Sequence, residues 1–211
     1  EDPEAAHLLH LSSPVLRLRD LRAIELLEDP AFRSVRVSAT FSTSHGAEAL
    51  ESAIGRVCHE AVSAVESGAH LLVLTDEAIN PGQAPIPMLL GVGAVQHALI
   101  AAGCRMRADL IVSTGQAWDV HQFSALIGYG ASAICPRLAL HTAQAISLSN
   151  GKVDETQADN FVASAEAGIR KVMSKMGIST LSSYHGAQIF EAVGLADEVV
   201  DRCLPGTPST I

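Results

Sequence analysis

The chain repeats one order of hydrophobic and polar positions four times: a helix, a glycine and a short apolar strand. In the first unit, Leu50, Ile54 and Val57 recur three and four positions apart, which is the spacing of one helix face. Gly68 then ends that helix, because the residue after a helix often adopts a left-handed conformation that glycine reaches without strain. The same pattern predicts further helices over 86–102, 120–127 and 154–176, and strands over 70–74, 109–113, 132–135 and 178–181.

The beginning of the chain follows a different pattern. Residues 1–34 predict an irregular helical lead-in, with apolar positions from Leu16 to Leu27 before Asp29 and Pro30 end it. Residues 35–41 alternate apolar and polar, as a strand with one exposed face does. The chain then has about five strands, and their alternation with helices predicts a mostly parallel sheet. We expect an α/β fold with an open or partial βα-barrel-like sheet, since five strands cannot close an eight-stranded barrel.

Three regions follow from this pattern. Residues 1–34 are the lead-in, 35–203 the α/β domain, and 204–211 a linker rich in turn residues. A polar cluster at 147–153 predicts a surface loop, and Asp154 begins the last long helix. We expect that helix to face the sheet through an apolar stripe of Val162, Ala165, Ile169, Val172 and Met176.

Composition narrows the classes of function. Hydrophobic residues make up 48% of the chain and charged residues 18%, which is a globular composition. The net charge of −9 argues against nucleic acid as a partner, because binding to phosphates needs a positive face. The first residues lack the basic region of a signal peptide, and the apolar run over 86–102 is too short to span a bilayer comfortably. We therefore expect no membrane partner and a cytoplasmic or plastid-stromal location.

Cysteines and histidines do not have the spacing of a metal site. Cys58, Cys104, Cys135 and Cys203 stand far apart with no C-x-x-C pair, which favours small buried thiols. A site built from His97, His121 and His141 would need three segments to converge, and a lone histidine on a packed helix more often belongs to the core. We expect no metal ligand in this chain.

Polar residues at the strand ends are the candidate chemistry, because α/β proteins place their active sites there. Asp76 and Glu77 follow one strand and could act as paired carboxylates, although such residues more often cap a helix or face solvent. Thr114 follows the next strand and Arg137 the one after. One hypothesis is therefore a freestanding α/β enzyme or binding protein that uses Asp76, Thr114 and Arg137 on a small phosphorylated or acidic ligand.

Four segments together resemble glutamate synthase. They are the region around Asp29–Phe32 and Ala39–Phe41, the run APIPMLLGVGAV over 84–95, the block from Gly115 to Pro136, and the run from Lys171 to Leu195. Each motif is short, but four in the same order are specific. Within the family, Gln116, Trp118, Ser132, Cys135 and Leu140 resemble the ferredoxin-dependent type.

The resemblance implies a domain internal to a long flavoprotein that makes glutamate from glutamine and 2-oxoglutarate. The full enzyme would carry FMN and a [3Fe-4S] cluster and accept electrons from ferredoxin or a pyridine-nucleotide reductase subunit. The piece at hand would be a non-catalytic scaffold between the glutaminase domain and the flavin-binding barrel, with 204–211 leading toward that barrel. No nucleophile, flavin or cluster motif lies in this sequence, so we expect neither catalytic residues nor cofactors here.

The sequence departs from the family pattern at Gln96, Ala98, Gln122, Arg137 and His141, where the family has histidines, a tyrosine and an acidic residue. These departures imply that the family histidines are structural or interfacial rather than catalytic.

The run after the last predicted strand mixes an aromatic ring, an imidazole and an amide, which suits a buried polar contact. We therefore expect Ser183, Tyr184, His185 and Gln188 to contact the flavin barrel. The alternative is that Ser183 caps the following helix and Tyr184 closes the domain's own core.

Overall fold

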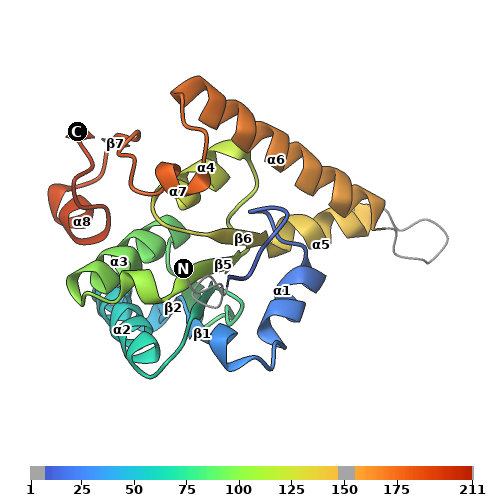
Figure 1. The fold of residues 1–211 in the computed structure, drawn as a ribbon. Coiled ribbons are helices and arrows are strands. Elements are labelled where there is room, and N and C mark those ends of the chain that lie inside the picture. The colour runs from blue at the N-terminus through green and yellow to red at the C-terminus, as the bar shows by residue number, and fades with distance from the viewer. Residues whose placement is uncertain (1–7, 147–154, 211) are drawn as a thin grey trace, which may run out of the picture.

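A four-stranded parallel sheet lies at the centre of the molecule, with α2 and α3 on one face and α1 and α5 on the other (Figure 1). The computed structural model describes residues 8–146 and 155–210. The strand order is β1-β3-β5-β6, and all three pairs are parallel. The α-helices are α1 (Leu18–Glu25), α2 (Gly46–Glu66), α3 (Met88–Ala101), α4 (Val120–Gly128), α5 (Arg137–Ile146), α6 (Thr156–Met176), α7 (Leu181–Tyr184) and α8 (Asp197–Cys203). The strands are β1 (Ser34–Ser38), β2 (Thr40–Ser42), β3 (Leu71–Thr75), β4 (Gln83–Pro85), β5 (Asp109–Thr114), β6 (Ala133–Pro136), β7 (Ala192–Val193) and β8 (Ser209–Thr210), and the 3₁₀ turns are η2 (Pro30–Phe32), η3 (Thr43–His45) and η4 (Arg105–Arg107).

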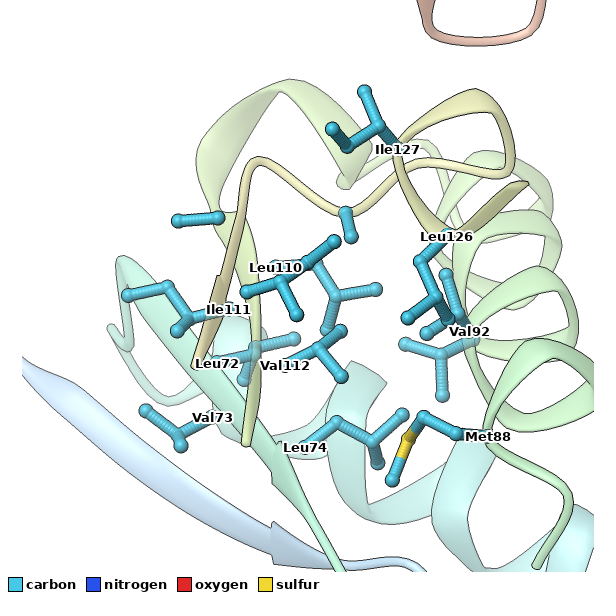
Figure 2. Packing of buried hydrophobic residues seen from close by; sticks show 14 of the residues in the cluster. Leu72, Val73, Leu74, Met88, Val92, Leu110, Ile111, Val112, Leu126 and Ile127 are labelled. Carbon is cyan, nitrogen blue, oxygen red and sulfur yellow. The ribbon is translucent and has the colours of Figure 1, made fainter. Parts of the chain in front are cut away.

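The central strands are apolar because both of their faces are covered. Every residue of β3 is buried. Figure 2 shows Leu74 and Val112 pointing toward Met88 and Val92 of α3, while Val73 points to the opposite face. Side chains that alternate between two apolar layers explain why these strands lack the polar alternation of a half-exposed strand.

The α/β class, the mostly parallel sheet and its alternation with helices are confirmed. The glycine stops are confirmed as well: Gly68, Gly103, Gly130 and Gly177 have positive φ angles of 90°, 66°, 117° and 70°. At Gly177 the left-handed residue forms the C-cap of α6.

Two predicted strands differ from the structure. Residues 35–41 form two strands, because Ala39 leaves the sheet after its N–H bonds the Thr75 carbonyl at 2.7 Å. The predicted strand over 178–181 is wrong. Instead, Thr180 accepts a hydrogen bond from the Ser183 N–H at 3.3 Å and caps the short helix α7. Neighbouring hydroxyls offer the backbone such local partners in place of a strand ladder.

Helix α6 also differs from its prediction. Its buried residues are Ala158, Val162, Ala165, Ile169 and Met173. Val172 is only half-buried and Met176 is exposed. The helix packs on α4 and α5 rather than on the sheet, and Gly168 lets Val120 approach its backbone. The predicted start at Asp154 and the loop over 147–153 lie outside the described residues.

Both ends of the described chain pack on the domain. Val15 pairs in parallel with Ile134 beside β6, and Leu16, Leu21 and Ile24 are buried. Near the other end, β8 pairs with β7, so Ser209 and Thr210 form part of a small second sheet. No helix within the described ranges is long and apolar enough to cross a membrane.

Candidate functional site

The carboxyl ends of β3, β5 and β6 meet at one buried carboxylate, Asp76, which is 2% exposed. Its oxygens accept hydrogen bonds from Thr114 Oγ1 at 2.7 Å and from Arg137 Nη2 at 2.8 Å. The Gly115 N–H donates at 3.0 and 3.1 Å, and Gln116 Nε2 donates at 3.2 Å. We call Asp76, Thr114, Gly115, Gln116 and Arg137 the strand-end cluster.

The order of the strands explains why these residues meet. Asp76 follows the last residue of β3, Thr114 ends β5, and Arg137 begins α5 directly after β6. In a parallel sheet these positions share one edge. Gln116 also ties α3 to the cluster, since its side chain accepts from the Met88 N–H and donates to the Ile86 carbonyl, both at 3.0 Å.

The strand-end cluster is neutral as a whole, with one buried carboxylate opposite one guanidinium. A buried charge is stable only when it is paired and hydrogen-bonded, and Asp76 meets both conditions. Glu77 lies outside the cluster, where it is exposed and bonds Arg36 Nη1 at 2.7 Å. Asp76 and Glu77 therefore do not act as the paired carboxylates that the sequence allowed.

The backbone amides at this edge are also engaged. The Gly115 N–H donates to Asp76, and the Gln116 N–H donates to Thr114 Oγ1 at 3.0 Å. A phosphate would have to displace the Asp76 carboxylate to reach these donors. The cluster therefore has the chemistry of a structural hydrogen-bond network that joins the strand ends rather than of an anion site.

Two apolar side chains lie exposed beside the strand-end cluster. Trp118 is 44% exposed, and its indole Nε1 donates to the Gly115 carbonyl at 2.8 Å. Leu138 is 47% exposed and lies near the Gly115 Cα hydrogens.

The residues described do not fit a metal or an iron–sulfur cluster. Among them, no three His, Cys, Asp or Glu side chains lie together as possible ligands. Cys104, Cys135 and Cys203 are buried free thiols, and burial raises the pKa of Cys135 to about 12. A thiol with so high a pKa is protonated at neutral pH.

The four residues expected at an interdomain contact do not all face the surface. Tyr184 is buried under α4, and burial raises its pKa. His185 Nε2 lies 3.2 Å from the Ala131 carbonyl, and burial lowers its pKa, as does the nearby Arg105. Ser183 is exposed and accepts a hydrogen bond from Thr180 Oγ1 at 2.9 Å. Gln188 is exposed with a φ of 53°, a left-handed conformation for a residue that is not glycine.

The departures from the family pattern have structural roles at three positions. Gln96 accepts a hydrogen bond from Arg105, Gln122 completes the capping box of α4, and Arg137 pairs with Asp76. Ala98 is half-buried in α3, and His141 is exposed on α5.

A groove of about 230 Å³, which no sequence pattern predicted, lies between α3, the end of α4 and the C-terminal segment. Residues 186–190 form one wall and Ile100 of α3 lies on another. Phe190 stacks on Tyr129 at 5.9 Å between ring centroids, and Tyr129 Oη is 2.7 Å from Thr207 Oγ1. Only the fold brings these distant segments together.

Comparisons with known proteins agree on one family. The family described as glutamate synthase central domain matches residues 1–196. Ferredoxin-dependent glutamate synthase 2 of Synechocystis is 42% identical over 99% of this chain, and the chloroplastic ferredoxin-dependent glutamate synthase of Oryza sativa is 45% identical over 99%. The large chain of NADPH glutamate synthase from Bacillus subtilis is 40% identical over 96%. The chain spans only 14%, 14% and 13% of the length of these three relatives.

Proposed function

This chain belongs to the glutamate synthase family as a central domain, and we propose that it joins and orients the active sites of a longer enzyme. That enzyme makes glutamate from glutamine and 2-oxoglutarate, and so assimilates ammonia. In this proposal a neighbouring glutaminase domain releases ammonia from glutamine, and a flavin-binding barrel uses it. The chain itself contributes structure and no reacting group.

The observation that carries this proposal is the internally paired strand-end cluster. In an enzyme of this architecture, the carboxyl edge of the sheet presents free polar groups to a substrate. Here Asp76 already holds Thr114, Gly115, Gln116 and Arg137. An edge that is occupied by its own carboxylate favours a scaffold over a freestanding enzyme for phosphorylated or acidic ligands.

We place the FMN and the [3Fe-4S] cluster of the full-length enzyme outside this chain. Two observations support that placement: the described residues hold no group of three possible metal ligands, and the strand-end amides are already engaged. The electron donor that we propose is ferredoxin, because relatives that are 42% and 45% identical carry ferredoxin in their names. A reductase subunit that uses a pyridine nucleotide is the alternative, and a cytoplasmic or plastid-stromal location suits either donor.

We further propose that the surface around Ser183, His185 and Gln188 contacts the flavin barrel, with Tyr184 supporting it from the core. Ser183 and Gln188 are exposed, so they are available to a neighbouring domain. His185 lies between them and is neutral at pH 7 because burial lowers its pKa.

The test uses the full-length enzyme with Ser183→Ala and Gln188→Ala combined. Glutamine hydrolysis should persist while glutamine-dependent glutamate formation falls, because the two active sites would no longer be aligned. The matched control combines Ser44→Ala with Thr142→Ala, which removes two exposed hydroxyls elsewhere and should change neither rate. If both activities fell equally, or if the double substitution destabilised the 211-residue chain itself, Ser183 and Gln188 would belong to the domain's own fold. A full-length wild-type enzyme that forms no glutamate from glutamine and 2-oxoglutarate would refute the proposed function itself.

A further inference from the structure

The groove between α3, α4 and the C-terminal segment has an unusual composition for an acidic chain. Among the described residues that line it, none is Asp, Glu, Lys or Arg. Besides the Tyr129 hydroxyl, its titratable group is the His97 imidazole, whose pKa is lowered by burial, so the ring is neutral at pH 7. The remaining polar groups are the amides of Gln96 and Gln188 and the hydroxyls of Tyr129 and Thr207.

This composition selects the kind of occupant. Glutamine, glutamate and 2-oxoglutarate carry carboxylates, and FMN carries a phosphate, so each would need a charged or strongly donating partner. The groove offers instead the exposed side chain of Ile100 and the Tyr129–Phe190 stack. Apolar walls with a few amides and hydroxyls are typical of the centre of a protein–protein contact.

The last described residues of the chain lie beside the groove. Pro205 and Thr207 line the groove, and β8 ends at Thr210, three residues beyond Thr207. Figure 1 shows β7 on the same side of the molecule as α7. Each extended residue covers at most about 3.6 Å, so a segment that continues from here begins close to the groove.

The relatives are far longer than this chain. They match 96–100% of this chain, which spans 10–14% of their length. We infer that in the full-length enzyme the groove is the docking seat for an uncharged, apolar segment of the polypeptide that follows residue 211. The inference rests on the proposed function, in which the flavin barrel follows this chain, and it adds Ile100 and His97 of α3 to the interface.

A photocrosslink in the full-length enzyme tests the inference. Ile100, 51% exposed, is replaced by the photoreactive benzoylphenylalanine, and the irradiated protein is digested and analysed by mass spectrometry. The expected product joins the peptide of residue 100 to a peptide from beyond residue 211. A crosslink to a second copy, to polypeptide that precedes residue 1, or to no peptide at all overturns the inference. The control carries the same group at Met176, which is 52% exposed at the end of α6, and should give no such product.

Hydrogen exchange provides an independent readout. Ile100→Asp puts a charge into the seat, so the amides of 186–190 should exchange about tenfold faster in the full-length enzyme, with Met176→Asp leaving them unchanged. Unchanged exchange in Ile100→Asp, or equal acceleration in both variants, contradicts docking. Glutamate formation by the wild-type enzyme is measured in parallel. Loss of the crosslink in an active enzyme overturns the docking seat alone, whereas an inactive wild type overturns the proposed function.

Discussion

Asp76 occupies the position at which a parallel sheet usually receives an anion from outside. Its carboxylate draws the guanidinium of Arg137, the hydroxyl of Thr114 and the N–H of Gly115 onto one point. A buried carboxylate that lost one of these donors would keep its desolvation cost and lose part of its compensation. The residue that looks most like a catalytic acid in the sequence is therefore one on which the stability of the fold depends.

Removing one donor should reveal this dependence. Thr114→Val keeps the shape of the side chain but deletes the 2.7 Å hydrogen bond to Asp76, together with the 3.0 Å bond that Oγ1 accepts from the Gln116 N–H. Hydrogen bonds to charged groups are worth about 1.5–3 kcal/mol, so we expect a loss of about that size in the free energy of unfolding measured with urea. Thr142→Val is the control, because its exposed hydroxyl bonds the Leu138 carbonyl one turn earlier in the same helix, and it should cost about 0.5 kcal/mol or less. Similar losses in both variants would contradict the special position of Asp76.

His185 should make stability depend on pH. Burial, and then the charge of Arg105, lower its pKa in the folded state, while the Ala131 carbonyl and Asp109 oppose the shift. The unfolded chain then binds a proton more readily than the folded one, so stability is present above the unfolded pKa of about 6.5 and is lost as pH falls below it. His97 contributes with the same sign, because burial lowers its pKa too.

His185→Gln keeps a side-chain N–H for the Ala131 carbonyl but cannot titrate. The urea midpoint of this variant should fall less between about pH 7 and pH 5 than that of the wild type. His121→Gln, at an exposed position on α4, serves as the control and should retain the wild-type slope. A His185→Gln slope equal to that of the wild type would show that this ring does not link protonation to folding.

At the scale of single residues, the sequence predicted the positions of Asp76, Thr114 and Arg137 at one edge but not their pairing. Pairing depends on the register of three strands and on where each side chain points, which local pattern does not encode. For the same reason, the sequence did not decide whether Tyr184 points into the core or toward a neighbouring domain.

Helices α3 and α8 meet through a glycine. A Cβ on Gly93 would collide with the backbone carbonyl of Cys203, which cannot swing aside as a long side chain can. Gly55 in α2 is different, since its added Cβ would lie 3.7 Å from Arg202 Nη2, at ordinary contact distance. Close packing therefore requires a glycine at position 93, whereas the space around position 55 would admit a Cβ.

Alanine at each position separates them. Gly93→Ala should destabilise the domain by more than about 1 kcal/mol, because α8 would have to move away from α3. Gly55→Ala should stabilise it by about 0.5–1 kcal/mol, since alanine is the better helix former. Melting temperatures of the two variants should move in opposite directions from that of the wild type. A Gly93→Ala protein as stable as the wild type would mean that α8 is only loosely attached.

At the scale of elements, periodicity predicted most helices and the glycine stops, because these are local properties. It failed for residues 178–181, where the hydroxyl of Thr180 stabilised a helix start over a strand. It missed α5, because that helix begins at Arg137 directly after β6, with no loop between the strand and the helix. In the last turns of α6 the predicted buried residues were Val172 and Met176, whereas Met173 is the one buried. The helix packs on two helices rather than on the sheet, so its buried face differs from the predicted one.

At the scale of the whole molecule, the family could be identified from short motifs, but the groove could not. Its walls come from α3, from the end of α4 and from residues 186–190, 205 and 207, and no spacing along the chain indicates that they converge. The described ends, with Val15 beside β6 and Thr210 beside β7, are also integrated into the fold in a way that turn-rich composition did not predict.

The whole-molecule prediction is that the 211-residue chain, purified alone, is colourless and releases no ammonia from glutamine. A [3Fe-4S] cluster needs three thiolates close together, and in the described part of the chain no three His, Cys, Asp or Glu side chains are grouped as possible ligands. A flavin phosphate would compete with Asp76 for the N–H of Gly115. The measurements are visible absorbance after reconstitution with FMN, iron and sulfide, and ammonia release, with the full-length enzyme treated identically as the positive control. Stoichiometric flavin absorbance in the short chain would show that the strand-end cluster opens to a ligand, and Asp76 would then be a binding residue. Stoichiometric iron–sulfur absorbance would instead contradict the placement of the [3Fe-4S] cluster outside this chain.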